Sequence, residues 1–323
     1  MLDVVYTNGV IAAKETSLLG SKIYKLCEMS ADDAFRAVLE SGFLRGAEVS
    51  SVFEYEKLLA ADDRDIDAFI REYAPTNAEK AYFLTPRDFH NAKAIVKAFY
   101  TGAEEEKMLA PEGLLSVEQI SLCIKEENYD PLGKELAQAC KESAQLFKEE
   151  NSSVTGAQVG AIFENALYRC LNARCKSNSF LKNLIKRKAD YTNVLTALRS
   201  HTPEYAATNY VEGGKIKREK LEKLFTSDDD KIVEEFKGSG LEEFLKACLE
   251  AKRQGLPYTK AERMLSDLET EQLAAKKYEL KNTQPFLYYV LRRRAENLNL
   301  RILFVCLMAG MDENDIKKRL RLV

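Results

Sequence analysis

The sequence predicts an all-α protein, and two observations support this prediction. Most windows place apolar residues three and four positions apart, as at Leu241, Phe244, Leu245 and Cys248, which is the spacing of one face of a helix. Glycine (15) and proline (7) are scarce among 323 residues, which favours long helices over a turn-rich sandwich or barrel. Strand-like alternation is rare and amounts to at best a short extended piece at 209–211.

A short motif, an acid followed three positions later by asparagine, occurs three times and leads each time into an amphipathic helix with basic residues. The three pairs are Asp88 and Asn91, Asp190 and Asn193, and Glu296 and Asn299. The acids lie 102 and then 106 positions apart. We interpret the motif as structural, with the acid in the first turn of its helix and the asparagine bonding a neighbouring loop or lobe. An interface with another molecule is the alternative.

Two further elements recur in the same order. Asp32, Asp130 and Asp228 lie 98 positions apart, each where a helix is expected to start, because acids favour the positive end of a helix. A Glu-Gly element at 111–115 returns at 211–215, each time before a short helix. The recurrences predict three helical domains at 1–103, 104–208 and 209–323.

Composition excludes several classes of protein. The net charge is −3, so a dedicated nucleic-acid binder is disfavoured. The seven cysteines form no CxxC pair, and we expect reduced, buried thiols in a cytoplasmic protein. No signal peptide is visible. A helix needs about 20 apolar residues to span a bilayer, and the longest apolar stretch, 302–311, is shorter than that. We therefore expect no direct transmembrane segment.

Motifs of enzymes and cofactor sites are incomplete. Gly213-Gly214-Lys215 lacks the first glycine and the final Ser or Thr of a P-loop. The run Asp62-Asp63-Arg64-Asp65 has the wrong spacing for a helical magnesium site. His90 and His201 lie in no metal or triad pattern. We predict no catalytic, cofactor-binding or metal-binding residue.

Two basic runs are candidates for an interface. One is Arg292, Arg293 and Arg294, and the other is Lys186, Arg187 and Lys188. A solvated helix face is the simpler interpretation of both runs. The alternative is contact with acidic groups on another protein of a complex or on a neighbouring lobe.

Three segments together resemble a known family. LTPRDFHNAKAIVKA, RKADYTNVLTALRS and LRRRAENLNLRILFVCLMAGMDENDI are similar to the three repeats of the C subunits of V/A-type ATPases, the family of the eukaryotic d subunits. The resemblance extends over essentially the whole chain. It implies three similar helical domains arranged as a funnel with pseudo-threefold symmetry.

The same resemblance implies a non-catalytic central-stalk subunit. It would lie on the cytoplasmic face of the membrane, between the D and F subunits of the shaft and the proteolipid ring of c/K subunits. There it would couple shaft and ring during ATP-driven or ATP-synthesising translocation of protons or sodium. A stand-alone helical scaffold of the same triplicated fold is the main alternative, and a helical enzyme with a buried acidic pocket is a third.

Overall fold

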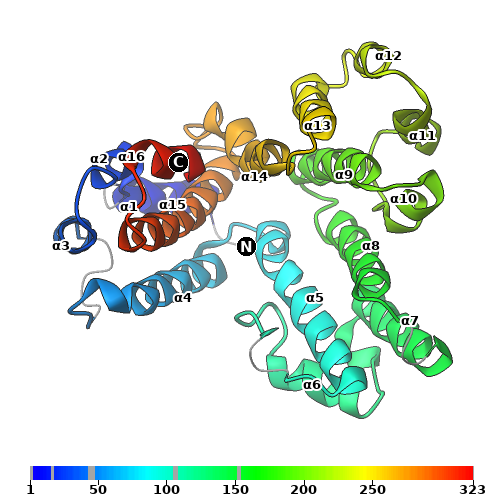
Figure 1. Ribbon diagram of the computed structural model, residues 1–323. Helices are drawn as coiled ribbons and strands as arrows, with labels where there is room; N and C mark the ends of the chain where they lie inside the picture. Colours follow the sequence, from blue (N-terminus) through cyan, green and yellow to red (C-terminus); the bar gives the residue numbers. More distant parts are fainter. Residues whose placement is uncertain (1–2, 16–17, 43–47, 105–107, 151–153, 323) are drawn as a thin grey trace. The chain divides into compact units, whose positions relative to one another are not determined.

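The computed structural model describes residues 3–15, 18–42, 48–104, 108–150 and 154–322. Within these ranges every regular element is a helix and none is a strand, so the predicted all-α class is confirmed (Figure 1). The recurring aspartates lie where helices begin: Asp32 in the first turn of α3, Asp130 at the start of a 3-10 turn, and Asp228 at the N-cap of α12.

The chain divides into two compact units. Unit 1 consists of Met1–Glu79 and Ser266–Val323, and unit 2 of Lys80–Leu265. The chain enters unit 2 within α5 (Asn77–Thr101) and returns to unit 1 within α14 (Thr259–Ala274). These limits differ from the boundaries expected near 103 and 208. The three domains 1–103, 104–208 and 209–323, and their funnel, stay predictions.

Unit 1 is built around one long helix, α15. Its helices are α1 (Val4–Lys14), α2 (Ile23–Leu26), α3 (Ala31–Glu40), α4 (Tyr55–Tyr73), α15 (Gln284–Met308) and α16 (Glu313–Arg319), with 3-10 turns at Gly20–Lys22 and Val52–Glu54. Phe304 of α15 packs edge-on against Phe35 of α3, with ring centroids 5.7 Å apart. Phe286 stacks on Phe69 of α4 at the same distance. Apolar burial thus joins α15 to segments that are early in the sequence.

A buried ion pair adds a polar tie between α4 and α15. The Arg293 guanidinium bonds the fully buried Asp62 carboxylate, and it also reaches Asp65 Oδ2 and Tyr289 Oη at 3.1 Å each. Asn297 Nδ2 donates to Asp62 Oδ2 at 3.1 Å. Burial by itself lowers the pKa of Arg293, but the adjacent Asp62 carboxylate outweighs it, so this pKa lies above its usual value.

Unit 2 contains two helix groups. Its further helices are α6 (Val117–Lys125), α7 (Lys134–Glu150), α8 (Gly156–Arg174), α9 (Ser179–Arg199), α10 (Pro203–Asn209), α11 (Arg218–Thr226), α12 (Asp229–Glu235) and α13 (Glu242–Gln254), with a 3-10 turn at Asp130–Leu132. One core joins the C-terminal half of α5 to α6, α7 and α8, and includes Phe89, Ile124 and Phe163. In the other group, Tyr191 of α9 packs against Phe244 of α13, with centroids 4.3 Å apart.

All seven cysteines are buried and free. Burial raises the pKa of the Cys140 and Cys248 thiols to about 12. A thiol with such a raised pKa is a poor nucleophile at neutral pH, so these two side chains act as small apolar groups in the packing.

Replacement of Arg293 tests the buried ion pair. Arg293→Met leaves the Asp62 carboxylate buried without its cation, so we expect a loss of about 3–5 kcal/mol in the free energy of unfolding. The double variant Asp62→Leu/Arg293→Met removes both charges and should recover much of that loss. Urea denaturation followed by circular dichroism measures each value.

Arg301→Met is the matched control on the same helix. Its pair with Glu56, at 3.1 Å, is exposed, so its removal should cost less than about 1 kcal/mol. Equal losses for Arg293→Met and Arg301→Met would contradict the assignment of a buried tie.

Candidate functional site

The asparagine of each repeated motif lies on a long helix and fastens a later loop segment. Asn91 Nδ2 donates to the Ala110 carbonyl oxygen at 3.1 Å, and the Ala110 N–H donates back to Asn91 Oδ1 at 2.8 Å. The same two bonds join Asn193 to Val211 at 2.9 and 2.8 Å, and Asn299 to Arg321 at 3.1 and 2.6 Å. Each buried amide therefore satisfies both backbone groups of one loop residue.

The acid of each motif fastens the segment before a following helix. Asp88 Oδ1 accepts the N–H of Leu115 at 3.0 Å, just before α6. Asp190 Oδ1 accepts the N–H groups of Lys215 and Ile216 at 2.7 and 2.9 Å, just before α11. We call the contacts of each acid and its asparagine an acid–asparagine bracket.

The third bracket reaches back to the beginning of the sequence. Glu296 Oε1 accepts the Gly20 N–H at 2.8 Å and Oε2 accepts the Leu19 N–H at 3.2 Å. Leu19 lies 277 positions before Glu296 and directly before the helical segment that leads into α2. The segment before α2 is therefore held by the acid of α15, just as the segment before α6 is held by the acid of α5 and the segment before α11 by the acid of α9.

One detail of the expected motif is wrong. The three acids do not lie in the first turn of a helix; they lie in the middle of α5 (Asn77–Thr101), α9 (Ser179–Arg199) and α15 (Gln284–Met308). Each helix begins well before its acid, because the residues that precede the acid are already helical; in α5 they include Pro86. The carboxylates therefore accept N–H groups of distant loops instead of capping their own helix.

The recurring glycines follow from this close approach. A Cβ atom at Gly113 would lie 2.2 Å from Asp88 Oδ1 and 2.6 Å from the Leu84 carbonyl oxygen. A Cβ atom at Gly214 would lie 2.4 Å from Asp190 Oδ1. A side chain at either position would displace the loop from its carboxylate. Gly213-Gly214-Lys215 is thus part of a bracket.

Burial dominates the electrostatics of the brackets. It raises the pKa of Asp190 and of Glu296, and the N–H donors of the loops oppose this shift only in part. Glu296 is fully buried, and Arg292 lies 3.7 Å from its Oε1 atom. The carboxyls work here as hydrogen-bond acceptors for backbone.

The arginine run points mostly into unit 1. Arg293 is buried in its pair with Asp62, Arg292 lies beside Glu296, and Arg294 is 4.0 Å from Asp67. Contact with acidic groups is therefore present, but inside unit 1. The sequence did not reveal these partners, because Asp62 lies 231 positions away in a run that resembles a solvated face.

The lysine run lies partly exposed on α9. Arg187 donates to the Gly240 carbonyl oxygen at 3.0 Å and lies over the Tyr191 ring. Lys188 lies over the Tyr82 ring, with Nζ 5.8 Å from its centroid. Arg187 and Lys188 thus contact other residues of unit 2. An interface with another molecule that includes Lys186 stays a prediction.

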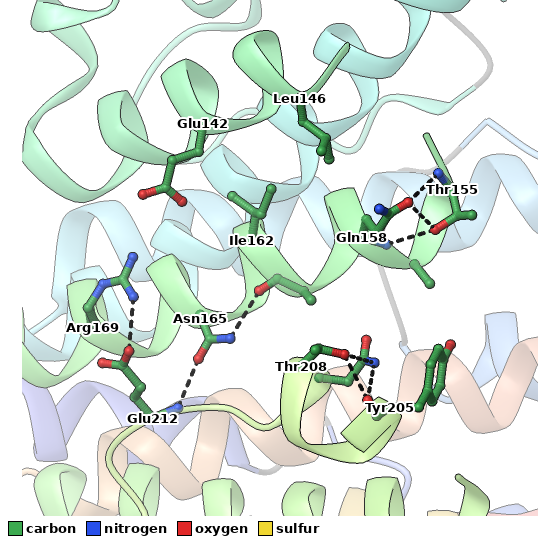
Figure 2. Close-up of a pocket in the computed structure, with 13 residues that line it drawn as sticks. Glu142, Leu146, Thr155, Gln158, Ile162, Asn165, Arg169, Tyr205, Thr208 and Glu212 are labelled. Atoms are coloured by element: carbon green, nitrogen blue, oxygen red, sulfur yellow. Dashed lines mark hydrogen bonds and ion pairs between the residues drawn. The ribbon is translucent and has the colours of Figure 1, made fainter. Parts of the chain in front are cut away.

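A hollow of about 730 Å³ in unit 2 is lined by α7, α8, α10 and the segment after α10 (Figure 2). Figure 2 shows Asn165 and Arg169 of α8 in contact with Glu212, and Thr155 and Gln158 in contact with each other at the start of α8. Asn165 Nδ2 donates to the Tyr210 carbonyl oxygen at 3.0 Å, its Oδ1 accepts the Glu212 N–H, and Arg169 pairs with Glu212 at 3.3 Å. These contacts join α8 to the segment after α10.

No group of three or more His, Cys, Asp or Glu side chains within the described residues is arranged to hold a metal ion. Among the helices that the structure describes, none combines the length and apolar character that a bilayer crossing requires.

The fold and the brackets define a class of protein: an all-helical body in which loops are fixed to the middles of long helices by buried side chains. The family model described as "ATP synthase (C/AC39) subunit" matches residues 7–319, and the chain therefore belongs to this family. Its members are central-stalk subunits of V/A-type ATPases. A search of curated proteins finds no match.

Two isosteric substitutions test the brackets. Asp190 uses one oxygen for both of its N–H donors, so Asp190→Asn keeps that acceptor and should change the free energy of unfolding by less than about 1 kcal/mol. Glu296 uses one oxygen for each donor. In Glu296→Gln the side-chain NH₂ group therefore faces a backbone N–H group, which loses its acceptor. We expect the free energy of unfolding, measured by chemical denaturation, to fall by about 2–3 kcal/mol.

The pH dependence of the same comparison has a defined sign. Because burial raises the pKa of Asp190 above 3.8, the folded protein binds this proton more tightly than the unfolded chain. The contribution of Asp190 to the free energy of unfolding of the wild type therefore falls as pH rises from 3.8 through the folded-state pKa. Asp190→Asn does not titrate, so this decrease is absent in the variant. The variant should gain stability relative to wild type from acid to neutral pH; a relative loss over that range would contradict the assignment.

Proposed function

We propose that this chain is the non-catalytic central-stalk subunit that couples the D–F shaft to the proteolipid ring of a rotary V/A-type ATPase. The observation that carries the proposal is the family match over residues 7–319. In this role the chain works at the cytoplasmic face of the membrane. Its partners are the D and F subunits of the shaft and the c/K subunits of the ring.

The contacts of each unit suit this role. A body that passes torque between two others must deform little under load. Buried helices with internal backbone hydrogen bonds are stiff, and their loops are usually the compliant parts. Here three loops are fixed by acid–asparagine brackets, and α4 is tied to α15 by Arg293 and Asp62. The brackets thus make the loops, which are usually the most deformable parts of a helical protein, stiffer.

A pull-down separates this function from that of a stand-alone scaffold with the same fold. The tagged full chain is expressed in its own cells, recovered from detergent-solubilised membranes and examined by mass spectrometry, with the tag alone as control. We expect the D, F and c/K subunits among the recovered proteins. Recovery of other partners without any protein of a rotary ATPase would favour the scaffold.

Ion transport tests the coupling itself. Complexes that lack the chain should hydrolyse ATP without ATP-driven ion uptake into vesicles, and addition of the purified chain should restore uptake. The chain alone should hydrolyse no ATP. Uptake that does not depend on the chain would contradict the proposal.

A further inference from the structure

Basic residues that follow two of the acid–asparagine pairs meet at a second hollow in unit 2. This hollow has a volume of about 460 Å³ and is lined by residues of α5, α8, α9 and α10. Lys93 of α5 and Arg199 of α9 line it directly. Lys97 lies beside it, because Lys97 Nζ donates at 3.2 Å to the carbonyl oxygen of Gly156, the residue before Ala157 in the lining. The brackets do not use these basic side chains, so their convergence needs another explanation.

Small residues of α8 leave the hollow unfilled. Ala157, Gly160 and Ala161 lie on one face of the first turns of this helix and line the hollow together. A Cβ atom at Gly160 would have no heavy atom within 4 Å outside its chain neighbours and the backbone of its own helix. Glycine weakens a helix relative to alanine, and no close packing at Gly160 requires it. The space over Gly160 is therefore open to a ligand.

Two lysines of α5 stand next to each other at the edge of this space. Lys93 and Lys97 are one helical turn apart, a spacing at which like charges destabilise a helix. Among the described residues no carboxylate pairs with either side chain, and Lys97 bonds a neutral carbonyl oxygen. Burial lowers the pKa of Lys97, and the charge of Lys93 lowers it further. An anion placed between the two lysines would relieve this repulsion.

The other charged groups around the hollow do not balance the lysines. Arg199 pairs with Glu262 within unit 2, so these two charges offset each other. Glu164 of α8 lines the hollow and is exposed, and in the part of the chain that the structure describes it forms no ion pair with Lys93 or Lys97. Two lysines therefore face one carboxylate, which leaves an excess of positive charge at the hollow.

Hydroxyl groups complete the lining. Thr192 and Thr196 stand one turn apart on α9, and Thr192 Oγ1 lies 3.4 Å from Tyr168 Oη. The Thr196 hydroxyl has no partner among the described residues, so it is free to donate to an oxygen of a ligand. Tyr205 of α10 is 55% exposed and also lines the first hollow, where Figure 2 shows its ring. The lining thus offers cations, a free hydroxyl and one aromatic face.

The charge and the size of the hollow select one class of ligand. A phosphate monoester carries a charge of about −1.5 to −2 at pH 7, which matches two lysines better than the single charge of a carboxylate does. Its oxygens accept hydrogen bonds from ammonium and hydroxyl groups, and lysine binds phosphate as a point charge. A volume of about 460 Å³ lies within the range of about 300–1,000 Å³ for pockets that hold small organic ligands. The hollow therefore has room for a phosphate group and for the organic body that bears it.

We infer that this hollow binds the phosphate group of a small phosphorylated compound, which Lys93 and Lys97 hold by charge and Thr196 by its hydroxyl. The organic part of the compound lies over Gly160 and against the Tyr205 ring. This inference does not rest on the proposed coupling function, because it concerns a ligand of unit 2 and no contact with another subunit.

Binding of phenyl phosphate to the full chain tests the inference, with phenyl sulfate as a probe of similar shape and a single negative charge. Broadening of the ring-proton NMR signals measures both affinities at one ionic strength. We expect phenyl phosphate to bind at millimolar concentration or below. It should bind at least about threefold more tightly than phenyl sulfate, because its additional negative charge is attracted to the lysines.

Two variants locate the bound phosphate. Gly160→Leu places a better helix former in an open space, so the fold should be kept while leucine fills the hollow, and binding should weaken by at least about tenfold. Lys93→Gln/Lys97→Gln removes both cations together with their repulsion, and it should also weaken binding by at least about tenfold. The matched control, Lys125→Gln/Lys134→Gln, changes two exposed lysines of α6 and α7 and should bind as the wild type does.

Glu164→Gln gives a change of the opposite sign. It removes the carboxylate that lines the hollow, so affinity for phenyl phosphate should rise by about threefold. Absence of phenyl phosphate binding at millimolar concentration would overturn the inference, as would equal affinity for phenyl sulfate. Unchanged affinity of Gly160→Leu or of Lys93→Gln/Lys97→Gln would place the bound phosphate outside this hollow and would overturn it as well.

Discussion

The described structure depends on buried acceptors in the middles of three long helices. A backbone N–H group that folding removes from water without a partner costs about 1–3 kcal/mol. The loops at 110–115 and at 211–216 make these contacts outside any regular element, and residues 19–20 make them where a 3-10 turn begins; Asp88, Asp190 and Glu296 supply the acceptors. Asn91 and Asn193 add a second point of attachment to the first two loops, at positions 110 and 211, and Asn299 fastens a separate segment at position 321. These bonds fix the position of each segment along the axis of its helix.

Unit 1 depends most on contacts between distant parts of the sequence. Glu296 holds the segment before α2, Arg293 holds α4, and Asn8 of α1 donates to the Leu280 carbonyl oxygen at 2.8 Å. These contacts cross between 231 and 277 positions. Such separations cost loop-closure entropy, so the N-terminal helices and α15 are expected to become ordered together. That arrangement makes the N-terminal helices and α15 parts of one cooperative unit.

The sequence predicts some of these features and conceals others. Periodicity and scarce glycine predicted the all-α class, and the three acid-x-x-Asn pairs identified the side chains that form the brackets. The sequence could not show that the acids lie mid-helix, because an acid near a helix also suggests a cap. Nor could it show the Arg293–Asp62 pair, since each partner stands in a charged run that suggests a solvated surface.

Hydrogen exchange at single backbone amides tests the central claim most directly. Ala110, Val211 and Arg321 belong to no helix, and Arg321 follows the last one, where amides usually exchange fast. Because the N–H of each is bonded to a buried asparagine, we expect these three amides to exchange as slowly as those inside α5, α9 and α15. Exchange at the rate of an unstructured peptide at all three would contradict the account.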